Sequence, residues 1–206
     1  MSLSTWWALL GACLLISLTP GAGAVNTMTN ALNVGFRRSF WGILGQQAAL
    51  LIQLAIVAAG LGVVIANSPT AFAVIRYCGA AYLGYLGLRQ ILADPGPDEE
   101  TVAGRADEPA RSLFLRGLWV NLSNPKAIVF LVAFIPGFVA PERDLFTQYG
   151  LIGITVVAVD VLVMWFVFAL LGRAFRRLTA TARGRRRLNV FFGVLFIAVG
   201  VMLAVM

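Results

Sequence analysis

The sequence predicts an all-α integral membrane protein with six transmembrane helices, arranged as two inverted three-helix repeats. Three observations carry this prediction. Of the 206 residues, 60% are hydrophobic and only 12% are charged, and the mean hydropathy is +0.86. Several windows reach the ~20 apolar residues that span a bilayer. A helix-breaking step also recurs within the first span of each half, so each repeat is expected to begin with a broken helix.

Six apolar segments are expected to form the spans. They cover residues 6–34, 41–66, 70–92, 113–140, 149–172 and 188–206. Short connections with turn signals separate them at Arg37-Arg38, at Asn67-Ser68-Pro69 and from Pro141 to Asp144. The acidic segment 94–112 contains proline and glycine and predicts a flexible cytoplasmic linker. It divides the chain into an N-terminal repeat, residues 1–93, and a C-terminal repeat, residues 113–206.

The arginine distribution predicts how the chain is oriented. Thirteen arginines fall on one side of the six spans, and the opposite side has only Arg143 in a loop. The thirteen are Arg37, Arg38, Arg89, Arg105, Arg111, Arg116, Arg173, Arg176, Arg177, Arg183, Arg185, Arg186 and Arg187. The positive-inside rule assigns that side to the cytoplasm, so both termini are expected outside and residues 173–187 inside. Despite the net charge of +7, this pattern favours topology and lipid contact over nucleic-acid binding.

The two helix-breaking steps are matched in position. Thr19-Pro20-Gly21 lies in "SLTPGAG" in the first span, and Asn124-Pro125 lies in "NLSNPKA" in the fourth. Proline removes a backbone donor and clashes with the preceding turn. In a membrane the freed backbone groups must lie beside a cavity or inside the protein. Matched breaks in inverted halves are typical of a secondary transporter with a midplane site; two ordinary proline kinks are the alternative.

Three motifs together resemble the LysE/RhtB family of amino-acid exporters. They are "SLTPGAG" (17–23), "RYCGAAYLGYLGLR" (76–89) and "NLSNPKAIVF" (121–130), and they follow in the right order along the chain. At Ala22 this sequence lacks the second proline that the family usually has. The resemblance implies export of an amino acid or similar small zwitterion across the bacterial inner membrane, with protons as the coupling ion. No enzymatic activity and no cofactor are expected.

Three charged side chains lie within the predicted spans: Arg76, Lys126 and Asp160. The helical rise places Lys126 and Asp160 about 15 and 17 Å deep, near the middle of a core about 30 Å thick. Charges at such depth are usually paired or functional, so the two are expected to meet. Either they form an ion pair that fixes packing, or Lys126 receives a substrate carboxylate and Asp160 takes a proton or the ammonium. Arg76 either snorkels or acts as an extracellular gate.

Uncharged polar residues within the spans extend the candidate site. They are Gln46, Gln47 and Gln53 in the second span, Asn121 and Asn124 in the fourth, and Asn26 and Asn30 in the first. Hydrogen bonding between helices, worth ~1 kcal/mol or less each, is the alternative role. Small residues around Ala80 and Gly84 predict close helix packing, within the chain or across a homodimer.

The remaining chemistry excludes some functions and leaves one alternative. The chain has no histidine, so a histidine metal site or proton relay is excluded, and no metal is expected. The sequence shows no nucleophile–base pair, which disfavours an intramembrane enzyme. Cys13 and Cys78 both lie about 10–15 Å below the outer surface, which leaves a transmembrane thiol–disulfide electron carrier as the second hypothesis. Buried apolar cysteines are usually inert, so the exporter is preferred.

Overall fold

The computed structural model describes the chain except residues 68, 94–106, 141, 173, 175–180 and 206. The side chains of residues 61–67, 69, 71, 72, 75, 76, 202 and 203 also lie outside the description. The described residues form helices joined by short turns, and they contain no strand. The all-α prediction is therefore confirmed for the described chain.

The first half begins with a bent pair of helices. α1 (Leu3–Leu18) and α2 (Ala22–Val34) meet at 58°, and the residues between them are the Thr-Pro-Gly step. Thr19 ends α1 in an extended conformation, and its N–H and hydroxyl both bond to the Leu15 carbonyl. Because Pro20 cannot donate a backbone hydrogen bond, the helix stops here. The predicted break in the first span is present.

Two long helices complete the first half, α3 (Phe36–Asn67) and α4 (Pro69–Leu92). The turn that precedes α3 lies at Gly35, with φ of 86°, which is accessible to glycine but strained for other residues. The predicted turn at Arg37-Arg38 is wrong, because both arginines lie in the first turn of α3. Their charge is compatible with a helix that extends beyond the apolar core, so hydropathy alone misplaced the boundary.

The second half also begins with a bent element. Its parts are α5 (Ala110–Leu122), α6 (Pro125–Val129), the π-helical η1 (Phe130–Phe134) and the 3-10 helix η2 (Ile135–Phe138). α5 meets the segment Pro125–Phe138 at 55°. Pro125 is the first residue of α6, where a missing N–H costs nothing. Asn124 caps α6, since its side chain accepts a bond from the Lys126 N–H at 3.1 Å.

The chain continues through α7 (Leu145–Leu162), the π-helical η3 (Val163–Ala169) and α9 (Ala182–Val205). Asp144 caps α7 by accepting from the Thr147 N–H at 2.7 Å, and hydrogen bonds from Thr147 lower the pKa of the Asp144 carboxyl. The helices begin earlier than the expected spans do. As a result, residues 110–112 of the expected linker belong to α5, and residues 182–187 of the expected arginine-rich loop belong to α9. Residues 94–106 of that linker, and residues 173 and 175–180 of that loop, lie outside the described residues.

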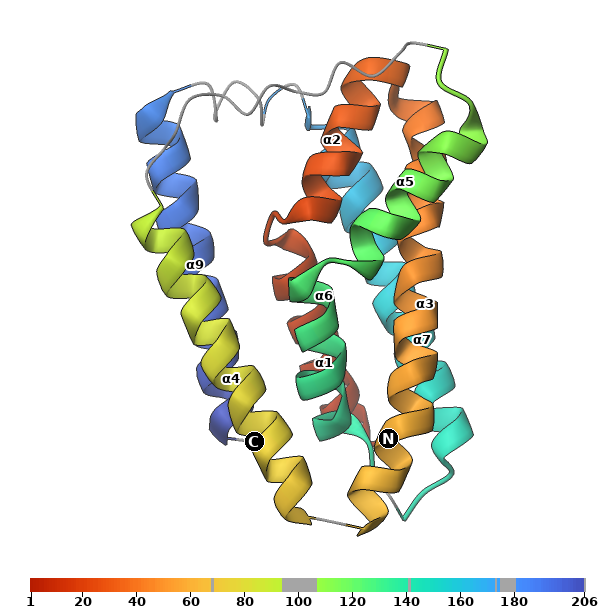
Figure 1. Cartoon of the computed structure of the whole chain (residues 1–206), viewed down its shortest axis with the longest axis vertical. Helices are drawn as coiled ribbons and strands as arrows, with labels where there is room; N and C mark the ends of the chain where they lie inside the picture. Colours follow the sequence, from red (N-terminus) through yellow and green to blue (C-terminus); the bar gives the residue numbers. More distant parts are fainter. Residues whose placement is uncertain (68, 94–106, 141, 173, 175–180, 206) are drawn as a thin grey trace.

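The helices pack so that the two breaks meet near the centre of the molecule. α1 and α2 run in the opposite direction to α5 and α6, and both chain termini lie at the same end (Figure 1). α3 packs along α5, α1 along α7, and α4 pairs with α9 at one side.

Glycines allow the closest of these contacts. A Cβ at Gly45 would collide with the Phe114 carbonyl, and one at Gly117 with the Gly42 carbonyl, so α3 and α5 touch backbone to backbone. Between α4 and α9, a Cβ at Gly87 would lie 2.5 Å from the Gly193 carbonyl oxygen.

The small-residue stretch around Ala80 and Gly84 packs within the chain. A Cβ at Gly200 of α9 would lie 2.9 Å from the Ala80 carbonyl oxygen and 3.3 Å from the Gly84 nitrogen. This part of α4 therefore serves the α4–α9 contact.

Several helices are long and apolar enough to cross a membrane. Among the described residues, Phe36–Gly60 and Leu145–Ala169 meet this criterion singly. The bent pairs Leu3–Leu18 with Ala22–Val34, and Ala110–Leu122 with Pro125–Phe138, meet it when each pair counts as one span. α4 and α9 coincide with the two remaining predicted segments.

Candidate functional site

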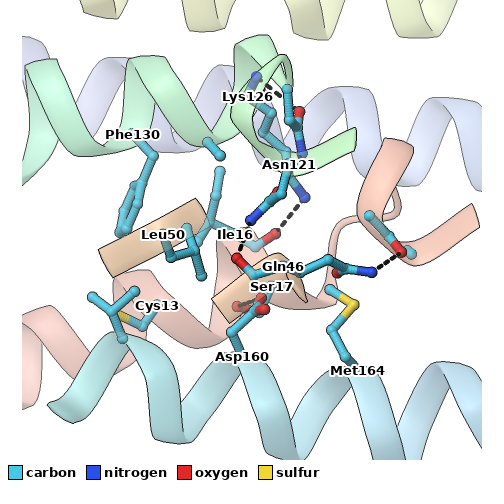
Figure 2. A pocket seen from close by; sticks show the side chains of 15 residues that line it. Cys13, Ile16, Ser17, Gln46, Leu50, Asn121, Lys126, Phe130, Asp160 and Met164 are labelled. Atoms are coloured by element: carbon cyan, nitrogen blue, oxygen red, sulfur yellow. Dashed lines mark hydrogen bonds between the residues drawn. The ribbon is translucent and has the colours of Figure 1, made fainter. Parts of the chain in front are cut away.

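A cavity of about 40 Å³ lies where the two breaks meet (Figure 2). Its polar lining comes from Ser17, Gln46, Asn121, Asn124, Lys126 and Asp160. Apolar side chains close the rest, including Ile16, Leu50, Phe130 and Met164. The lining therefore combines both halves of the chain with one acid and one base.

Lys126 reaches from the second half to the first break. Its Nζ donates to the Ile16 carbonyl at 2.9 Å and to the Thr19 carbonyl at 2.6 Å. In a continuous helix the N–H of residue 20 would bond to Ile16, but Pro20 has none. The ammonium supplies that donor at the negative end of the α1 dipole. This contact explains why a lysine lies within an apolar segment.

Gln53 makes the reciprocal contact from the first half to the second break. Its Nε2 donates to the Asn121 carbonyl at 3.1 Å and to the Leu122 carbonyl at 3.2 Å, at the end of α5. Pro125 removes the N–H that a continuous helix would offer to Asn121. Each proline thus removes the helical donor of a carbonyl to which a side chain of the opposite half donates, although the Asn121 carbonyl also accepts from the Asn124 N–H at 3.1 Å.

Asp160 has different partners. Its Oδ1 accepts from the Ser17 hydroxyl at 3.0 Å, and its Oδ2 accepts from Gln47 Nε2 at 2.8 Å. Lys126 and Asp160, both described, approach the cavity from opposite sides and form no ion pair within 4.0 Å (Figure 2). The direct pair expected from the sequence is not formed, because the α1 carbonyls hold the ammonium.

Amide side chains join three helices around the cavity. Gln46 Nε2 donates to the Gly23 carbonyl at 3.2 Å and to the Thr27 hydroxyl at 3.0 Å, tying α3 to α2. Asn121 Nδ2 donates to the Gln46 carbonyl at 3.0 Å, and Asn124 Nδ2 to Asn121 Oδ1 at 3.2 Å. Each amide both lines the cavity and fixes its walls.

A family model described as "LysE type translocator" matches residues 14–206. The chain belongs to the LysE translocator family. Two similar relatives are the homoserine/homoserine lactone efflux proteins of Salmonella typhi and Salmonella typhimurium. Each is 39% identical over 207 residues, which cover 99% of this chain and 98% of the relative. An uncharacterized membrane protein of Vibrio cholerae is 37% identical over 204 residues, with the same coverage. No solved structure gives a significant match.

Membership of the LysE family defines the class of activity. The chain is a multi-pass membrane protein and a transporter, not an enzyme. This disfavours the thiol–disulfide carrier. In agreement, both cysteines are free: Cys13 is buried beside the cavity, and Cys78 is exposed on α4.

The predicted site residues of this LysE translocator differ in how they relate to the cavity. Lys126, Asp160, Asn121, Asn124 and Gln46 line the cavity. Gln47 and Gln53 do not line the cavity, but they donate hydrogen bonds to two residues that do, Asp160 and Asn121. Asn26 is buried in α2 beside Gly42 and does not border the cavity. Thr19, Pro20 and Gly21 form the first break itself. The side chain of the candidate gate Arg76 lies outside the description.

Sequence reasoning missed Ser17 as a site residue. It is buried and bonds directly to Asp160. Its position as the first residue of "SLTPGAG", one helical turn before Gly21, was the available signal. Phe130 and Met164 were also missed, because nothing in an apolar span distinguishes a cavity wall from a core residue.

A second polar cluster joins α2 and α5 at the ends that are predicted to face the cytoplasm. Arg116 forms an ion pair with Glu108 at 3.0 Å and also donates to Asn30. Ser112 donates to the other Glu108 oxygen at 2.6 Å. This cluster ties the residues just before α5 to α2, the helix whose other end borders the cavity.

Proposed function

We propose that this LysE translocator exports homoserine or a closely related amino acid, and its lactone, using the cavity between the two helix breaks as its substrate site. The observation that carries the proposal is the position of Asp160, a partly buried carboxylate that lines the cavity at the two helix breaks. The named activity of the Salmonella relatives, which cover the chain almost completely, supports the substrate.

Two inverted three-helix repeats, residues 1–93 and 113–206, give this site its symmetry. In support, α1–α2 and α5–α6 run in opposite directions, and each is broken at a proline (Figure 1). Lys126 and Gln53 exchange caps between the halves. Rocking of one repeat against the other would expose the cavity to each side in turn.

The protein lies in the bacterial inner membrane with both termini in the periplasm. In support, α3 and α9 begin with arginines at the end opposite the chain termini (Figure 1). α5 also begins at that end, and Arg111 is its second residue. The positive-inside rule makes this end cytoplasmic.

Protons drive the export by competing with the substrate for Asp160. One carboxylate holds either a proton or a substrate ammonium, so the release of one is coupled to the binding of the other. Buried ionisable groups in membrane spans commonly serve such coupling. A cavity of about 40 Å³ accommodates roughly three waters. An amino acid therefore enters only when the walls move apart.

The test is counterflow and proton-driven efflux in proteoliposomes that contain the purified full chain. Homoserine efflux should accelerate when the receiving side is acidified, and Asp160→Asn should reduce it at least ~tenfold. Asp144→Asn is the matched control, because Asp144 is an acid outside the cavity and asparagine also caps helices. Efflux by Asp160→Asn equal to that of the control would refute the site. Homoserine flux indifferent to the proton gradient would refute the coupling.

A further inference from the structure

We infer that the cavity recognises the substrate by its ammonium and not by a charged carboxylate, and that Lys126 is a positioning residue. This inference rests on the proposed function and specifies its substrate class. The site would take small molecules with a primary ammonium beside a carboxylate, lactone, ester or amide group.

The first step concerns the hydrogens of Lys126. An ammonium has three donors, and two of them bond to the Ile16 and Thr19 carbonyls. A Cβ at Gly21 would lie 3.4 Å from both Cε and Nζ, so the lysine stem packs along the backbone of the break. A move toward a substrate carboxylate would leave two interior carbonyls without a donor, which is unfavourable in a membrane protein. The Lys126 ammonium therefore stays bonded to the carbonyls at the end of α1.

The second step concerns Asp160. Its two oxygens accept from Ser17 and Gln47, which are neutral donors, and the Lys126 ammonium does not approach within the 4.0 Å of an ion pair. A carboxylate has about four acceptor positions, and two are used. Gln47 Oε1 is buried with no hydrogen-bond partner, beside this carboxylate. The unused acceptor positions and the negative charge of Asp160, which lines the cavity, are complementary to a substrate ammonium.

The third step compares the two compounds named for the Salmonella relatives, homoserine and homoserine lactone. Both have an α-ammonium, but only the acid has a carboxylate. A site that paired Lys126 with the carboxylate would select strongly against the lactone, because a buried cation would lose its partner. A site in which Asp160 binds the ammonium should bind homoserine and its lactone with similar affinity.

The experiment measures transport by the wild-type chain in proteoliposomes with homoserine, homoserine lactone and N-acetylhomoserine. We expect KM values for the first two within about threefold, and at least ~tenfold weaker transport of the acetylated compound, which lacks the ammonium. A lactone KM more than ~tenfold above that of homoserine overturns the inference. So does efficient transport of N-acetylhomoserine. If none of the three is transported, the proposed function itself fails, and this outcome is distinct from either.

Two variants test the role of Lys126. Lys126→Met should lower the transport of homoserine and of its lactone by the same factor, because the lost contact is with α1. Gln53→Met provides the matched control, since it removes the cap of the other break without bordering the cavity. Selective loss of homoserine transport in Lys126→Met, with the lactone spared, would identify Lys126 as a carboxylate receptor and overturn the inference. The wild-type substrate comparison decides the question even if Lys126→Met does not fold.

Discussion

The Lys126 ammonium donates a 2.6 Å hydrogen bond to the backbone carbonyl of Thr19, so a side chain of the second half caps a helix of the first. Gln53 caps α5 in the reverse direction. Each of these side chains donates to a carbonyl whose helical donor a proline removes, so hydrogen bonds link the two breaks. A change of conformation at one break therefore breaks or strains the hydrogen bonds that it shares with the other.

Pro20→Ala should impair transport while leaving the protein folded. Alanine restores the N–H that bonds to the Ile16 carbonyl in a continuous helix, and this competes with Lys126 for its acceptor. We expect efflux to fall about tenfold with an unchanged size-exclusion profile. Pro109→Ala, an exposed proline before α5, is the control and should transport normally. Normal efflux by Pro20→Ala would show that the break is only a kink.

Gly87→Ala should destabilise the protein, whereas Gly84→Ala on the same helix should not. A Cβ at Gly87 meets the Gly193 carbonyl and Ile197, whereas one at Gly84 meets nothing within 4 Å. Overpacking typically costs about 1–3 kcal/mol. Thermal unfolding in detergent measures the difference between the two variants. Equal melting temperatures would mean that α4 and α9 are not in close contact.

A variant with Cys13→Ser and Cys78→Ser should retain homoserine efflux within about twofold, because neither thiol donates to a charged group of the site. Efflux in proteoliposomes, with and without reductant, provides the measurement. Loss of all transport by a well-folded double variant would return attention to the electron-carrier hypothesis.

The same cysteine-free background tests the orientation. Ser2→Cys should react with a membrane-impermeant maleimide added to intact cells, and Asp107→Cys should react only after the cells are permeabilised. Both positions are exposed, so lack of labelling cannot come from burial. Labelling of Asp107→Cys in intact cells would reverse the proposed topology.

The breaks and the polar lining were predictable from the sequence, because their causes are local. Proline at residues 20 and 125 ends a helix whatever packs beside it. The depth of Lys126 and Asp160 follows from helical rise alone. Helix ends were predicted less well, since α3 and α9 continue beyond the apolar core through arginines that hydropathy assigns to loops.

The sequence by itself determined that the chain is helical, where two helices break, and which charged residues lie deep within them. Only the tertiary structure decided which groups those charges contact. Depth brings Lys126 and Asp160 to the same level, but a hydrogen bond depends on which helix face lies opposite. There the carbonyls freed by Pro20 hold the ammonium, and Ser17 and Gln47 hold the carboxylate. The physical reason is that a broken helix offers unsatisfied acceptors of its own, which no pattern of side-chain charges reveals.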